Sequence, residues 1–176
     1  QLNVSESNSA TLYKLLTGMN ADLSDVSINI MIIISIASMT FGNIMALKQT
    51  NVKRMLAFSG VSHAGFMLMT LLNISNSAGN LLYYTTAYSL SGIAAFTVIL
   101  YTCKKNKRIE AFNGLGKRNP LMAAILTASL LSMAGIPIFA GFFVFMFLFT
   151  QPIAAGYFVV VIAAVINSII SVAYYF

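Results

Sequence analysis

Residues 120–150 read PLMAAILTASLLSMAGIPIFAGFFVFMFLFT, without a single charged side chain, and this stretch decides the fold. As one straight helix it would be roughly 46 Å long at 1.5 Å per residue, well beyond the ~30 Å hydrocarbon core of a bilayer. Gly135, Ile136 and Pro137 stand near its middle, and proline removes an amide donor and blocks the carbonyl four residues earlier. We therefore expect two half-helices whose free ends face the protein interior. A simple proline kink that serves packing is the alternative.

The composition of the whole chain agrees with a membrane environment. Of 176 residues 59% are hydrophobic and only 8% are charged, with a mean hydropathy of +0.84, which excludes an ordinary soluble domain. Backbone groups in lipid must be paired internally, and the apolar runs are continuous rather than alternating, so the spans must be helices. The predicted fold class is an all-α, polytopic transmembrane helix bundle.

Windows of about 20 apolar residues divide the chain into two parts. Residues 1–26 form a polar N-terminal segment, and residues 27–176 form a five-helix transmembrane repeat in which the fourth helix is interrupted near Gly135–Pro137. Tyrosines near the span ends are expected to form an interfacial belt: Tyr83, Tyr84, Tyr101, Tyr157, Tyr174 and Tyr175. The predicted spans are residues 27–47, 55–72, 81–102, 120–150 and 153–176.

The basic residues predict the orientation of these spans. Every lysine and arginine except Lys14 falls within residues 48–54 or 104–118, which the five-span topology places on one face. The positive-inside rule explains this distribution and the net charge of +6, so the partner is a lipid bilayer and no nucleic acid.

The chemistry that the sequence lacks is also informative. Cys103 is the only cysteine, which excludes an internal disulfide and any multi-thiol metal or iron–sulfur site. The chain has no glycine-rich phosphate loop, no plausible nucleophile triad and no acidic residue within a predicted span. We expect no metal, no cofactor and no catalytic residue in this chain.

Three ionisable residues open the second span, and they are the best candidates for function. Lys53 and Arg54 precede His63 in the run from Gln49 to Gly65, and ionisable groups at a membrane usually mark function. A histidine, or a lysine with a lowered pKa, can exchange a proton at physiological pH. A solvated anchor for Arg54 and a helix-to-helix hydrogen bond for His63 are the structural alternatives.

Residues 42–65, GNIMALKQTNVKRMLAFSGVSHAG, strongly resemble the antiporter-like membrane subunits of respiratory complex I, with subunit N the nearest type. Residues 84–96, 112–120 and 133–143 support the resemblance, which covers roughly residues 27–176. Members of that family contain two inverted five-helix repeats, each with a broken fourth helix, so the chain resembles the second repeat alone. A chain that begins at Gln1 is also expected to start inside a longer polypeptide.

The resemblance implies a function and a site. It implies proton translocation driven by NADH:quinone electron transfer, in a non-redox subunit whose flavin and iron–sulfur centres are held by other subunits. Other membrane subunits of complex I and a first repeat of the same fold would be partners, in a bacterial or mitochondrial inner membrane. Lys53 and His63 match the family's proton-transfer lysine and histidine, and Gly135 and Pro137 match its helix break.

Phe145 departs from the family pattern. The pattern after the break is Gly-Phe-Phe/Ile-x-Lys-Phe with a proton-channel lysine, whereas this chain has Phe145 at the lysine position. A phenyl ring cannot take up or release a proton, so the half-channel is expected to be inactive or the sequence altered there. The resemblance therefore leaves two other readings open, a subunit of a multi-subunit cation/proton antiporter and a non-transporting structural membrane module.

Overall fold

The computed structural model describes residues 3–72, 77–103, 109–137 and 139–175, with side chains described from residue 25 onward. The predicted all-α fold is confirmed, since nearly every described segment is helical. The elements are α1 (Asn3–Leu47), α2 (Val52–Thr70), α3 (Ser77–Thr102), the short 3-10 helix η2 (Ile109–Phe112), α4 (Leu115–Arg118), α5 (Pro120–Met133), α6 (Ala140–Ala154) and α7 (Phe158–Tyr175).

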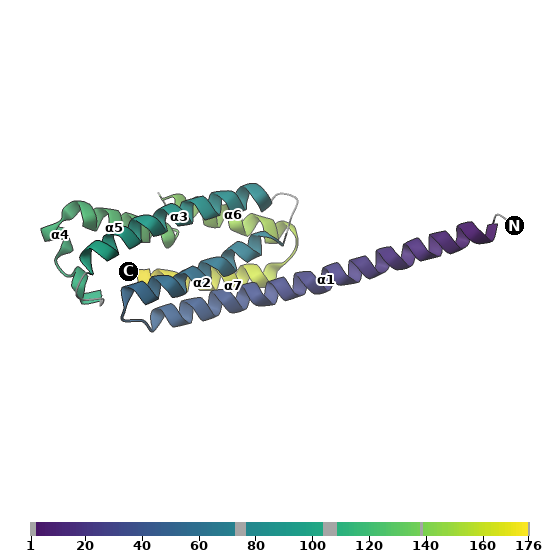
Figure 1. The fold of residues 1–176 in the computed structure, drawn as a ribbon, viewed down its shortest axis with the longest axis horizontal. Helices are drawn as coiled ribbons and strands as arrows, with labels where there is room; N and C mark the ends of the chain where they lie inside the picture. Colours follow the sequence, from purple (N-terminus) through teal and green to yellow (C-terminus); the bar gives the residue numbers. More distant parts are fainter. Residues whose placement is uncertain (1–2, 73–76, 104–108, 138, 176) are drawn as a thin grey trace.

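The chain crosses the bundle five times, and α5 and α6 share one crossing. Figure 1 shows the turn between α1 and α2, the short helix α4 and the C-terminus at one end of the bundle, and the turn between α6 and α7 at the other. The described basic residues of 48–54 and 117–118 therefore lie at the same end, as the charge distribution predicted. The N-terminal part of α1 extends past the opposite end.

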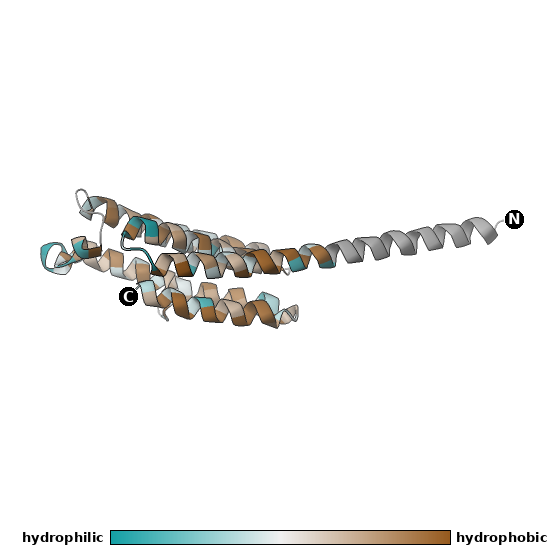
Figure 2. Ribbon diagram, turned by 90° about the horizontal axis from the view of Figure 1, so that it is seen from below, coloured by the Kyte–Doolittle hydropathy of each residue, from teal (hydrophilic) through white to brown (hydrophobic). Residues whose placement is uncertain are grey.

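Among the residues that the structure describes, three helical segments are long and apolar enough to cross a membrane by length and composition, namely Asp25–Leu47, Ala78–Thr102 and Phe158–Tyr175. The two halves of the broken span, α5 and α6, are shorter apolar helices. Figure 2 shows mainly hydrophobic residues along the helices and hydrophilic residues near their ends. Large apolar side chains such as Leu82, Leu90 and Val159 are exposed, as in a lipid-facing surface.

Helices α1 and α2 form the closest pair because glycines line their crossing. A Cβ on Gly42 would lie 2.5 Å from the Ser62 nitrogen, and one on Gly65 would lie 2.8 Å from the Met39 nitrogen. Small residues let helix backbones approach in membranes, where apolar burial gives little driving force. The Ser35 hydroxyl also donates to the Gly65 carbonyl at 2.8 Å. This packing fixes the rotation of α2 and hence the direction of His63.

The predicted break in the fourth span is confirmed, but two carbonyl groups at the end of its first half are hydrogen-bonded. Helix α5 ends in a Schellman motif: Gly135, with φ of +75°, donates to the Ser132 carbonyl at 3.1 Å, and Ile136 donates to the Leu131 carbonyl at 3.2 Å. The expectation of free half-helix ends facing the interior is therefore wrong for these two carbonyls. Pro137 follows the motif at an exposed position, where it prevents the helix from continuing.

Two predicted boundaries are also wrong. Helix α6 continues through Pro152 to Ala154, so the turn lies at residues 155–157 rather than at 151–152. Gly156, with φ of +80°, ends this helix with the same bond pattern, since Tyr157 donates to the Pro152 carbonyl at 2.9 Å. Helix α2 begins at Val52 because the Asn51 side chain caps it. The predicted polar segment, residues 1–26, continues from Asn3 onward into the first span, because both belong to the single helix α1.

Candidate functional site

His63 lies where three helices meet, with its side chain only 3% exposed. Its Nδ1 atom is 2.7 Å from the Tyr84 hydroxyl of α3, and its Nε2 atom is 3.1 Å from the Tyr175 hydroxyl of α7. A neutral imidazole has one donor and one acceptor nitrogen, and a hydroxyl can act as either. Both tautomers of His63 can therefore be satisfied by the same two tyrosines.

A fourth group extends this contact toward the end of α2 that carries Lys53. The Ser59 hydroxyl lies 2.6 Å from the Tyr175 hydroxyl, and Ser59 is completely buried. Ser59 and His63 are four residues apart, so they share one face of α2. The result is a continuous buried series of hydrogen bonds, which we call the hydroxyl–imidazole chain: Ser59, Tyr175, His63 and Tyr84.

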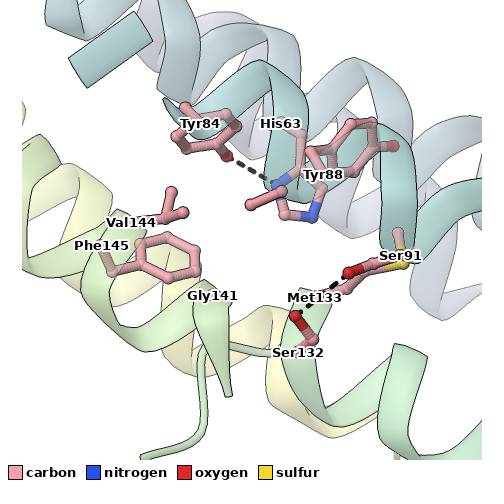
Figure 3. Close-up of a pocket in the computed structure, with 10 residues that line it drawn as sticks. His63, Tyr84, Tyr88, Ser91, Ser132, Met133, Gly141, Val144 and Phe145 are labelled. Carbon is pink, nitrogen blue, oxygen red and sulfur yellow. Dashed lines mark hydrogen bonds between the residues drawn. The ribbon is translucent and has the colours of Figure 1, made fainter. Parts of the chain in front are cut away.

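A small cavity separates His63 from the broken helix (Figure 3). The volume that the centre of a water molecule can occupy in this cavity is about 20 Å³, enough for roughly one water molecule. Across it, the Ser91 hydroxyl donates to the Ser132 hydroxyl at 3.1 Å. The lining residues are His63, Tyr84, Ala87, Tyr88, Ser91, Ser132, Met133, Gly141, Val144 and Phe145.

Phe145 borders this cavity directly opposite the histidine. Its ring centroid lies 6.5 Å from that of His63 and 5.2 Å, edge-on, from that of Phe66. Gly135 packs against the same ring, and a Cβ there would lie 2.5 Å from Phe145 Cδ2. Phe145 also lines a second cavity of about 280 Å³ at the helix break. An apolar ring thus separates the histidine from that larger space.

Lys53 does not touch His63. It is half-buried in the first turn of α2, ten residues before the histidine and roughly 15 Å from it along the helix axis. The neighbouring Arg54 is exposed, as an anchor would be. Burial raises the pKa of the Cys103 thiol, and the Lys53 ammonium group opposes that shift. Of the residues predicted for the site, the structure thus places His63, Phe145 and Gly135 close together. Lys53 and Pro137 lie outside this group.

The prediction that Tyr84 and Tyr175 belong to an interfacial belt is wrong. Both side chains are buried, at 2% and 7% exposed, and both bond to His63. Their positions near helix ends were a misleading signal, because the ends of α3 and α7 pack against α2. Thr97 of α3, by contrast, donates to the carbonyl of Ile93 in its own helix.

Within the described residues, no three histidine, cysteine, aspartate or glutamate side chains lie close enough together to hold a metal ion. The arrangement around His63 contains hydroxyls, an imidazole and space for water. Such groups can pass protons without a bound cofactor.

Residues 8–171 match the family described as NADH:quinone oxidoreductase/Mrp antiporter, TM. The chain belongs to this family of membrane proteins. It is 67% identical to the NADH-quinone oxidoreductase subunit N of Flavobacterium johnsoniae and 57% identical to that of Flavobacterium psychrophilum, over 95% of this chain in each case. It spans only 38% and 37% of the lengths of those two relatives.

Two solved structures share the fold. Respiratory complex I from Thermus thermophilus contains a chain with a TM-score of 0.72 and 29% identity, covering 84% of this chain and 34% of that one. The membrane-bound sulfane sulfur reductase, an archaeal respiratory membrane complex, gives a TM-score of 0.80 and 25% identity, covering 86% and 32%. The family and the apolar helices identify a membrane protein, and its bacterial relatives point to the bacterial inner membrane.

Proposed function

We propose that this chain is a proton-translocating, antiporter-like module of an NADH:quinone oxidoreductase. The observation that carries the proposal is the burial of His63 between two tyrosine hydroxyls, beside a small cavity and the broken helix. Buried histidines in membrane helices are costly unless paired, and they commonly belong to proton paths. Membership of the family and the high identity to subunit N relatives support this placement.

His63 is the proton-exchanging group in this proposal. Lys53 serves as the second titratable group, at the basic end of the bundle, and water must bridge the distance to the Ser59 end of the hydroxyl–imidazole chain. The redox cofactors would be held by other subunits, and this chain would supply none of their ligands. Its partners would be other membrane subunits of the complex and another five-helix repeat of the same fold.

Phe145 bears on two rival functions. Because its ring closes the cavity on the side of the helix break, it favours a structural module that transports no protons. The family also includes antiporter subunits, so a cation/proton antiporter is the second rival. The three functions differ in what His63 does, and that difference can be measured.

The test uses the full-length subunit, assembled with its natural partners in inner-membrane vesicles. His63→Ala should reduce NADH-driven proton uptake, while the amount of assembled subunit stays unchanged. Thr97→Ala is the matched control, because it removes a hydroxyl that bonds only within its own exposed helix turn. Unchanged proton uptake in His63→Ala would favour the structural module. Sodium-driven proton movement without NADH would favour the antiporter.

A further inference from the structure

We propose that the Tyr175 hydroxyl is the proton-transfer group that connects His63 with a water-accessible cavity at the basic end of the bundle. The inference rests on the proposed function and adds a residue to its path. Tyr175 is the one member of the hydroxyl–imidazole chain that both bonds to His63 and borders this outer cavity.

The outer cavity shares no lining residue with the small cavity at Phe145. It measures about 390 Å³, which is ample for several water molecules. Gln49 and Val52 belong to its lining, so it opens beside the turn that carries the basic residues 48–54. The rings of Tyr174 and Tyr175 line it from α7. Water in this cavity can therefore reach Tyr175.

The distances suit proton transfer through a hydroxyl. The Tyr175 oxygen is 3.1 Å from His63 Nε2 and 2.6 Å from the Ser59 hydroxyl, which holds it in place. A hydroxyl can give one proton and accept another in the same event, so no buried phenolate has to form. On the other side of the ring, Nδ1 is 2.7 Å from the Tyr84 hydroxyl, which borders the small inner cavity.

One transfer event can be written with every proton accounted for. The O–H bond of Tyr175 breaks as an N–H bond forms at His63 Nε2, and the Tyr175 oxygen takes a proton from a hydronium ion in the outer cavity. His63 releases its Nδ1 proton to the Tyr84 oxygen, and the Tyr84 hydroxyl passes its own proton to water in the inner cavity. Each side chain keeps its charge, and one proton has moved inward. His63 then has to return to its first tautomer before the next event.

Tyr174 provides a matched control next to the proposed group. It borders the same outer cavity, but its hydroxyl donates to Asn43 Oδ1 at 3.0 Å and not to His63. Tyr174→Phe removes a partly buried hydroxyl, Tyr175→Phe removes a buried one, and both keep the ring. They therefore have similar consequences for packing and different consequences for proton transfer.

The experiment measures NADH-driven proton flux in vesicles that contain the full-length subunit in its complex. The flux that depends on His63 is defined as the part lost in His63→Ala. Tyr175→Phe should lower that part by at least about tenfold, the scale of losing one acid–base group. Tyr174→Phe should leave it close to the wild-type value, because this hydroxyl bonds to Asn43 and not to His63. Replacing Tyr175 by 3-fluorotyrosine, which keeps the ring and the hydroxyl, should restore flux relative to Tyr175→Phe.

Four results would overturn the inference. Full His63-dependent flux in Tyr175→Phe would exclude the hydroxyl from the path and leave the proposed function standing. Equal losses in the Tyr174 and Tyr175 variants, or flux that stays lost when 3-fluorotyrosine returns the hydroxyl, would show that Tyr175 only supports packing. No loss in His63→Ala would instead contradict the proposed function itself, and the inference with it.

Discussion

The Asn43 side-chain amide donates hydrogen bonds to both oxygens of Asn167, at 2.8 Å to the backbone carbonyl and 3.0 Å to the side-chain oxygen. Both residues are buried, and the contact joins α1 to α7 across 124 positions of sequence. The Tyr174 hydroxyl donates to Asn43, and the Asn167 amide donates to Thr40 at 3.2 Å. This cluster joins the end of α7 to α1.

Asn43→Leu should destabilise the bundle by about 1–2 kcal/mol, because it leaves polar groups of Asn167 and Tyr174 without their partner. The unfolding free energy of the full-length subunit in detergent gives the measurement. The double variant with Asn167→Leu should cost less than the two single changes together, because the remaining partner is removed as well. Strictly additive losses would mean that the two asparagines are not energetically coupled.

Gly141→Ala should separate the two halves of the broken helix. A Cβ at Gly141 would overlap the Ser132 carbonyl oxygen, so α6 could not keep its crossing with α5. We expect a loss of stability of about 1–3 kcal/mol or more, seen as less folded subunit in the membrane. Gly92→Ala is the control, because nothing lies within 4 Å of the new Cβ there. Equal amounts of folded protein for both variants would refute the close contact.

Phe145→Lys should restore a titratable group beside the small cavity at His63. We expect this chain alone to conduct few protons, and the lysine to increase transfer only when the first repeat is also present. The reason is that a proton path needs groups whose protonation states are close in free energy, at about 1.4 kcal/mol per pKa unit of mismatch. Proton flux into liposomes is the measurement, with and without that repeat.

Phe145→Met is the control for the preceding substitution, because methionine removes the ring and adds no titratable group. It should leave the flux as low as in the present chain. Robust flux from the present chain alone, abolished by Lys53→Ala, would show that Phe145 does not interrupt the path.

Single cysteines should confirm the orientation of the bundle. Thr50→Cys and Gly116→Cys lie at exposed positions near the basic segments and should react with a membrane-impermeant label from the same side. Ala155→Cys, in the exposed turn after α6, should react from the opposite side. The native Cys103 is buried and is replaced by alanine in this series. Labelling of positions 50 and 116 from opposite sides would contradict the five-crossing topology.

The break in the fourth span could be predicted because its causes are local. Gly135 supplies the positive φ of the capping motif, and Pro137 cannot continue the helix, whatever the rest of the chain does. The same kind of local rule failed at Pro152, which lies inside α6. The turn there is set by Gly156, four residues after Pro152, so the prediction of a turn at the proline is wrong.

The sequence by itself determined the membrane class, the break in the fourth span and the basic end, because hydropathy, charge and chain-breaking residues act over a few positions. It also singled out His63 as a candidate. Only the tertiary structure decided that His63 bonds to Tyr84 and Tyr175, 21 and 112 residues away, and that Phe145 faces it across a cavity. It likewise placed Lys53 out of reach. These relationships depend on how α2, α3, α6 and α7 rotate and cross, and that is set by close contacts such as Gly42 with Ser62 and Asn43 with Asn167.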